Sequence, residues 1–248
     1  MSRLFQGMVF LSVFLCVMTA EAQIIINEVD CSQGAVDTQE FIELYDGGTG
    51  NTSLTGYVVV LYTGVTDTSY RAEDLDGYTT DAAGYFVIGS LGMGTEIEIN
   101  PGASGWLDDG AAAVAVYAAD GADFPDGTAV TAANLVDAVV YDTDDPDDAG
   151  LISTLLNAGQ GQVNENGNGT EATESMGRCP NGTGGAGNTS TYTWGSPSVS
   201  ATNDCLSATP TPTWTPVPVT PTPTPPPTDT PTPLPTDTPT PLPTDTPT

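Results

Sequence analysis

Two short stretches decide the fold class: IINEVD at residues 25–30 and EFIELY at residues 40–45. Both are rich in β-branched and aromatic residues, and neither is long enough for a typical helix. Gly, Asn and Asp separate them from the next apolar runs, as they do along the rest of residues 23–206. This punctuation is typical of an all-β domain with tight turns.

The same pattern predicts further strands and one helix. Strands are expected at residues 23–30, 40–45, 57–62, 69–75, 85–89, 112–118 and 135–141, with a further candidate at residues 191–194. A short helix is expected at residues 147–156, where acidic residues precede an apolar run. Strands at this spacing predict a two-sheet β-sandwich.

The first residues have the layout of a secretory signal peptide. Arg3 precedes an apolar run at residues 8–18, and small residues close the segment at Ala20 and Ala22. We therefore expect residues 1–22 to be cleaved and the protein to be secreted or held at the cell surface. Cys16 is the residue type that a lipoprotein signal needs, but Leu15 before it is bulkier than such signals usually have. No later stretch is apolar enough to predict a membrane span.

Residues 207–248 change abruptly to Thr and Pro, and the unit TDTPTPLP begins at residue 228 and again at residue 236. A segment of this composition buries no core. We expect a disordered, extended stalk that reaches on the order of 120 Å at ~3.1 Å per residue. The last repeat is cut short at Thr248, as expected for a fragment of a longer protein.

The charge balance excludes several classes of function. The chain has a net charge of -29, no His, and only three cations, Arg3, Arg71 and Arg178. Nucleic-acid binding needs Lys and Arg to displace phosphate counterions, so no direct contact with nucleic acid is expected. Without imidazole, the usual general base and His-ligated zinc are missing as well. Arg71 and Arg178 are each expected to lie among several carboxylates.

Several segments, in order, resemble bacterial secreted lamin-tail domains. They are IINEVD at 25–30, EFIELY at 40–45, LTGYVVVL at 54–61, GYFVIG at 84–89, AVAVY at 113–117, LVDAVVY at 135–141, and Glu174-Ser175 with RCPNG at 178–182. Ala112 and residues 198–200 depart from the family pattern. The resemblance therefore does not support a polar role at position 112 or the family's usual turn at residues 198–200. The resemblance implies an immunoglobulin-like sandwich without chemistry of its own. Such domains occur in exported bacterial proteins, sometimes beside nuclease or phosphoesterase domains.

Glu28 and Glu40 form the one pair that would suit acid-base chemistry. Regular strand alternation places Glu28 on the face of Ile26 and Glu40 on the face of Ile42. Two carboxylates near apolar surface would suit the acid and base of a glycosidase. The alternative, which we favour, is that both accept hydrogen bonds from backbone NH groups at a sheet end.

An acidic loop after residue 141 predicts a calcium site. Its oxygen ligands would be Asp142, Asp144, Asp145, Asp147 and Asp148. The loop lacks the glycine and the distal Glu of the helix-loop-helix calcium motif, so the alternative is a solvated turn that caps the following helix. A second, weaker candidate consists of Asp120, Asp123 and Asp126.

Three cysteines remain after signal cleavage, Cys31, Cys179 and Cys205. Spacing favours a disulfide between Cys179 and Cys205, which would close a Gly- and Asn-rich segment and stabilise the fold by roughly 3.5 kcal/mol. The rival pairing of Cys31 with Cys179 stays open. In the favoured pairing, Cys31 is either buried or free to pair between chains.

Together these patterns predict a non-enzymatic interaction or structural module on an extended spacer, with an extracellular protein or glycan as partner. Trp106, Trp194 and Trp214 are candidates for stacking on a sugar, although scattered aromatic residues more often fill a core. The alternative is an accessory N-terminal domain of a longer secreted enzyme, a nuclease or phosphoesterase, whose catalytic part lies beyond residue 248. No cofactor is expected apart from calcium.

Overall fold

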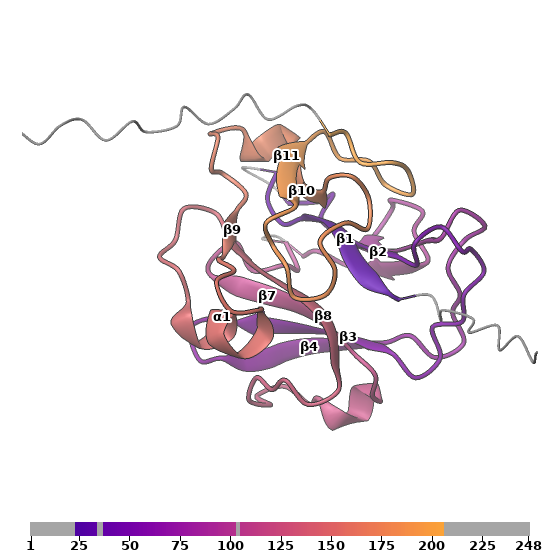
Figure 1. The fold of residues 1–248 in the computed structure, drawn as a ribbon, viewed down its shortest axis with the longest axis horizontal. Coiled ribbons are helices and arrows are strands. Elements are labelled where there is room, and N and C mark those ends of the chain that lie inside the picture. The colour runs from indigo at the N-terminus through magenta and orange to yellow at the C-terminus, as the bar shows by residue number, and fades with distance from the viewer. Residues whose placement is uncertain (1–22, 34–36, 103–104, 206–248) are drawn as a thin grey trace, which may run out of the picture. The chain divides into compact units, whose positions relative to one another are not determined.

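The computed structural model describes residues 23–33, 37–102 and 105–205. The predicted signal peptide and the predicted stalk lie outside the described residues. The predicted two-sheet β-sandwich is confirmed, because a six-stranded and a five-stranded sheet pack face to face (Figure 1).

The six-stranded sheet has the order β11-β10-β1-β2-β5-β6, and only β5 and β6 run parallel. Its strands are β1 (Ile25–Asp30), β2 (Phe41–Tyr45), β5 (Tyr85–Ser90), β6 (Ile97–Ile99), β10 (Ser175–Arg178) and β11 (Tyr192–Gly195). The late strand β10 therefore lies between β1 and β11 as an interior strand, and β11 forms the edge.

The five-stranded sheet has the order β4-β3-β7-β8-β9, and only β8 and β9 run parallel. Its strands are β3 (Val58–Thr63), β4 (Thr68–Asp74), β7 (Ala112–Tyr117), β8 (Leu135–Asp142) and β9 (Val163–Asn164). The helix α1 (Ala149–Leu155) and two short 3-10 helices, η1 (Gly121–Asp123) and η2 (Glu171–Thr173), complete the described elements.

The core between the sheets is built from alternate strand residues. Ile26 and Leu44 contribute from the six-stranded sheet, and Val59, Val114 and Val139 contribute from the other. The outer face of the five-stranded sheet is also buried, because Leu151 and Leu155 of α1 pack on it. Small residues there, Ala113, Ala115 and Ala138, let the helix approach closely. This double burial explains why β7 and β8 are apolar almost throughout.

The predicted strands are confirmed to within two residues at each end, and the helix is shorter than predicted by two residues at its start and one at its end. The strands β6, β9 and β10 were not predicted. The first two are only three and two residues long, and β10 contains Gly and Arg in place of β-branched residues. No helix in the described part of the chain combines the length and the hydropathy needed to cross a membrane.

One irregularity in β1 overturns a prediction about Glu28. The pairing of β1 with β2 shifts register between Ile26 and Glu28. As a result Val29 follows Ile26 into the core, and Glu28 lies opposite Glu43 on the outer face of the sheet. The prediction that Glu28 shares a face with Ile26 is therefore wrong, because a bulge interrupts the alternation.

Candidate cation site at one end of the sandwich

Both described arginines form ion pairs, Arg178 inside the domain and Arg71 at its surface. The Arg178 guanidinium pairs with Asp137 at 3.0 Å, and its other donors bind backbone carbonyl groups, including that of Ile26 at 2.7 Å. Arg71 pairs with Glu73 at 2.8 Å. Each arginine thus pairs with a carboxylate, and within ion-pair distance it has one such partner rather than several. The described residues form no other ion pair, so the remaining carboxylates face no positive side chain.

Three of those carboxylates converge at one end of the sandwich. Asp37 follows β1, Glu40 directly precedes β2, and Asp109 lies in the loop before β7. One carboxylate oxygen from each residue lies within 4.8 Å of the other two. Among the described residues this is the only such group of three acidic or sulfur-bearing side chains.

The loop at residues 105–107 wraps around Glu40. Its carboxylate accepts the backbone NH of Trp106 at 2.6 Å and that of Leu107 at 3.2 Å. Gly105 has a φ of +83°, and a Cβ there would collide with the Glu40 carboxylate, so glycine is required. Trp106 is held in turn by its indole NH, which donates to Ser90 Oγ at 3.1 Å. The favoured prediction for Glu40, an acceptor of backbone NH groups at a sheet end, is confirmed.

The electrostatics of this group favour a neutralising partner. Burial raises the pKa of Glu40 to about 8, although the two backbone hydrogen bonds oppose that shift. Burial also raises the pKa of Asp109 to about 6, and the neighbouring Asp37 carboxylate adds to the increase. Either protons or a cation can offset this concentration of negative charge. An all-oxygen donor set fits a hard divalent cation such as calcium or magnesium.

An open cleft of about 510 Å³ adjoins Asp109, one of the three carboxylates, and the loop that binds Glu40. It is lined by Thr63, Tyr70, Gly105, Trp106, Leu107, Asp108 and Asp109. The Tyr70 hydroxyl accepts the backbone NH of Asp108 at 3.2 Å, which ties β4 to the loop. The cleft gives a small solute or ion access to this end of the sandwich.

No three of the five aspartates predicted to bind calcium bring carboxylate oxygens within 4.8 Å of one another. Asp148 caps α1 by accepting the NH of Leu151 at 2.7 Å. This agrees with the alternative prediction, a turn that caps the following helix. The Asp144 carboxylate accepts from the side-chain amides of Asn164 and Asn166. Asp142 is buried, while Asp145 and Asp148 line a separate pocket of about 250 Å³. Asp147 belongs to no group of three. Calcium binding by this loop stays a prediction, as it does for Asp126 and for Asp120 and Asp123, which cap η1.

The suspected acid and base pair is not assembled. Glu40 lies toward the inner side of the six-stranded sheet, whereas Glu28 lies on its outer face, opposite Glu43. Glu28 accepts hydrogen bonds from Ser198 and from the Ser175 hydroxyl. Burial raises the pKa of Glu28, and these donors oppose the shift. Both carboxylates thus serve as acceptors that hold loops onto the sheet.

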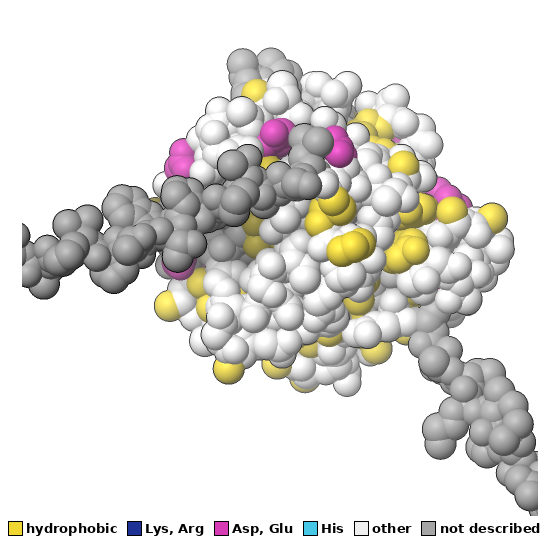
Figure 2. Space-filling view, turned by 45° about the horizontal axis from the view of Figure 1, so that its top comes forward, with side chains coloured by type: hydrophobic (Ala, Val, Ile, Leu, Met, Phe, Trp, Pro, Cys, Tyr) yellow, Lys and Arg dark blue, Asp and Glu magenta, His cyan; other side chains and the backbone are white. Residues whose placement is uncertain are grey.

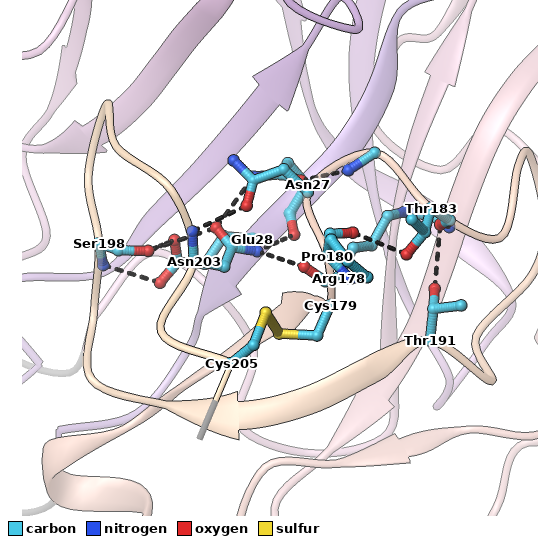
Figure 3. The surroundings of a disulfide bond; sticks show 12 residues. Asn27, Glu28, Arg178, Cys179, Pro180, Thr183, Thr191, Ser198, Asn203 and Cys205 are labelled. Carbon is cyan, nitrogen blue, oxygen red and sulfur yellow. Dashed lines mark hydrogen bonds between the residues drawn. A yellow bond between two sulfur atoms is a disulfide. The ribbon is translucent and has the colours of Figure 1, made fainter. Parts of the chain in front are cut away.

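The predicted disulfide lies beside Glu28 (Figure 3). Cys179 and Cys205 are joined with a Cα–Cα distance of 5.5 Å, so the rival bridge from Cys31 to Cys179 is not formed. Asn203 reinforces the closure, because its side-chain amide donates to the carbonyl groups of Asn27 and Arg178. The segment after β11 is therefore fastened to the outer face of the six-stranded sheet.

Cys31 is buried without a disulfide partner, and its thiol donates to Glu165 at 2.8 Å. Burial raises the pKa of Glu165 to about 9. Neither this contact nor the roles of Asp37 and Asp109 was predicted. These residues belong to loops that are distant in sequence, and no spacing signal links them.

The surface reflects the chain's excess of acidic over basic residues. Figure 2 shows a few Asp and Glu side chains toward the top and sides of the viewed face, hydrophobic side chains across its middle, and no Lys or Arg. No protein-family model matches this sequence, and no curated protein matches it either.

Proposed function

We propose that this protein is a secreted or cell-surface interaction module without catalytic activity. The observation that carries the proposal is the use of its buried glutamates. Glu28, Glu40, Glu43 and Glu165 all accept hydrogen bonds that fasten one segment to another. A catalytic acid or base must be free to exchange a proton with a substrate, and these side chains are committed to the framework.

The arrangement of the strands fits a lamin-tail-like, immunoglobulin-like module. The segments that resemble that family become strands β1, β2, β3, β5, β7, β8 and β10 of the sandwich. The disulfide between Cys179 and Cys205 is compatible with an oxidising, extracellular location. The loops and clefts of such a sandwich present a surface to a partner, and the Thr/Pro-rich stalk would hold that surface away from its attachment.

Two measurements test the proposal. The full chain should show no turnover on panels of nucleic acids, phosphoesters and glycosides, and it should retain a component of native cell-surface material in a pull-down with and without calcium. Turnover that is lost on a single change, Glu40→Gln, would refute the non-enzymatic assignment. Failure to retain any cell-surface component would refute the interaction role.

A further inference from the structure

A groove of about 340 Å³ lies where β9 of one sheet approaches β11 of the other. It is lined by Gly159, Gln160, Gly161, Gln162, Val163, Asn164, Thr189, Ser190, Tyr192 and Trp194. The lining therefore combines two aromatic rings with amides, hydroxyls and exposed backbone. This set of groups is what a ligand with both C–H and O–H groups would need.

The groove differs from its surroundings in charge. None of its lining residues is ionisable at neutral pH, in a chain with a net charge of -29. Four other cavities among the described residues each include at least one carboxylate. The absence of carboxylates at one concave surface of so acidic a chain matches an uncharged ligand, which needs no ionic partner.

Trp194 presents its ring rather than its NH to this groove. The side chain is 37% exposed, and its indole NH already donates to the Asn164 carbonyl at 2.8 Å. Gly167 lies against the ring, since a Cβ there would come within 2.6 Å of Trp194 Cζ2. These two contacts hold the ring in one orientation, with its NH already engaged, and an exposed aromatic ring attracts the C–H groups of a sugar ring.

The walls beside Trp194 are fixed before any ligand arrives. Gln160 Oε1 accepts the backbone NH groups of Thr189 and Ser190, each at 3.0 Å. Thr189 donates its hydroxyl to the Gly161 carbonyl at 2.7 Å. On the other side, Asp144 holds the Asn164 side chain through a hydrogen bond of 2.9 Å. A preformed wall lowers the ordering cost of binding.

We propose that this groove binds a neutral glycan, with one pyranose ring stacked on Trp194. The inference rests on the proposed function, since it names the partner class of the interaction module. Acidic glycans are excluded because the negative field of the whole chain repels them. Cationic ligands would instead be drawn to carboxylate clusters such as Asp37, Glu40 and Asp109.

Tryptophan fluorescence gives a direct test in the full chain. The sequence contains Trp106, Trp194 and Trp214, and Trp106 is only 7% exposed. In a Trp214→Phe background, Trp194 is therefore the tryptophan that a solute can reach. Titration with neutral oligosaccharides, found by screening neutral, sialylated and sulfated glycans in parallel, should shift its emission in a saturable way. The acidic glycans should produce no shift.

Calorimetric titration of variants then locates the site. Trp194→Ala should weaken binding of the selected neutral oligosaccharide by about fivefold to tenfold, the loss of one aromatic stacking contact. Tyr78→Ala is the matched control, because Tyr78 is also 37% exposed but packs on Phe86, away from the groove residues. The control should bind like the parent, and thermal unfolding should show that both variants are folded.

The outcomes separate this inference from the proposed function. Absence of neutral-glycan binding, equal binding of acidic glycans, or equal affinity of Trp194→Ala and the parent would each overturn the glycan assignment. If one of these results is obtained while the parent chain still retains a cell-surface protein, the interaction module stands and only the groove assignment fails. If neither glycan nor cell-surface material is retained by the parent chain, both fail.

Discussion

Arg178 and Asp137 form a fully buried ion pair that joins the two sheets. The Arg178 guanidinium lies 3.0 Å from the Asp137 carboxylate, and neither side chain has exposed surface. Arg178 belongs to β10 and Asp137 to β8. Asp137 also accepts the backbone NH groups of Ile26 and Gly187, so it connects three separate segments. In a chain with so few cations, this pair is the main electrostatic link across the core.

Removing the cation from this pair should be costly. Arg178→Gln leaves the Asp137 carboxylate buried beside a neutral amide, and we expect the free energy of unfolding to fall by about 3–5 kcal/mol. The control is Arg71→Gln, because Arg71 and Glu73 form a partly exposed pair and such pairs contribute ~0–1 kcal/mol. Urea unfolding measures both. Equal losses in the two variants would show that the buried pair has no special role.

Stability should decrease as the pH rises through neutrality. Burial raises the pKa of Glu40 and of Glu43 to about 8 and that of Glu165 to about 9. The unfolded chain releases these protons near pH 4.5, so between that pH and about 8–9 the folded state binds more protons. The stabilisation is therefore complete below pH 4.5 and is lost as the pH climbs to 9. Thermal unfolding at pH 5, 7 and 9 and fixed ionic strength should give the highest melting temperature at pH 5.

Glu165→Gln tests one contributor to the pH dependence of the melting temperature. The amide oxygen can still accept the backbone NH of Cys31, and the side chain no longer titrates. We expect the melting temperature to depend less on pH than in the parent. Asp126→Asn, on an exposed loop, should leave the dependence unchanged. A slope that is the same in all three chains would mean that surface repulsion, rather than buried carboxylates, sets the pH response.

Loss of the disulfide should loosen the last part of the domain. The Cys179–Cys205 bridge closes a loop with a sequence separation of 26, and the paired change to Ser should lower the free energy of unfolding by roughly 3.5 kcal/mol. Amide hydrogen exchange should rise first around Ser198 and Ser200, whose NH groups bind Glu28 and Glu43. Peptide mapping without reduction should recover the 179–205 crosslink in the parent. A crosslink through Cys31 would contradict the structure.

Calcium should raise the melting temperature at low ionic strength more than sodium does at matched ionic strength. The reason is that oxygen-rich groups bind a divalent ion, whereas sodium only screens. Asp145→Asn tests the predicted loop at residues 142–148, and Asp37→Asn tests the three converging carboxylates. If sodium does as well as calcium, or if both variants keep the full increment, site binding at these places is wrong.

The sequence predicts the sheet-forming parts of this fold well and the loop contacts poorly. Runs such as AAVAVY at β7 carry their own signal, because burial on both faces requires apolar residues. Glu28 shows where prediction from the sequence fails. One register shift moves its carboxylate to the opposite face of the sheet, and no residue in IINEVD indicates that a bulge occurs there.

Arg178 and Glu165 show the same limit for buried polar groups. The sequence indicates that a rare arginine needs a partner, but the four backbone carbonyl groups that Arg178 binds depend on how distant loops fold. Glu165 reaches Cys31 across 134 positions of the chain. Tertiary packing, rather than local pattern, decides such contacts. The candidate cation site was missed for this reason, whereas the Cys179–Cys205 pairing was found because loop length limits the choices.

The Cys179–Cys205 bridge also determines how a mechanical load would travel. Tension applied at Cys205 passes through two sulfur atoms to the end of β10, an interior strand held by β1 and β11. The covalent path bypasses residues 180–204, which include the edge strand β11. A domain tethered at this point would therefore receive the load first at an interior strand and not at the edge of its sheet.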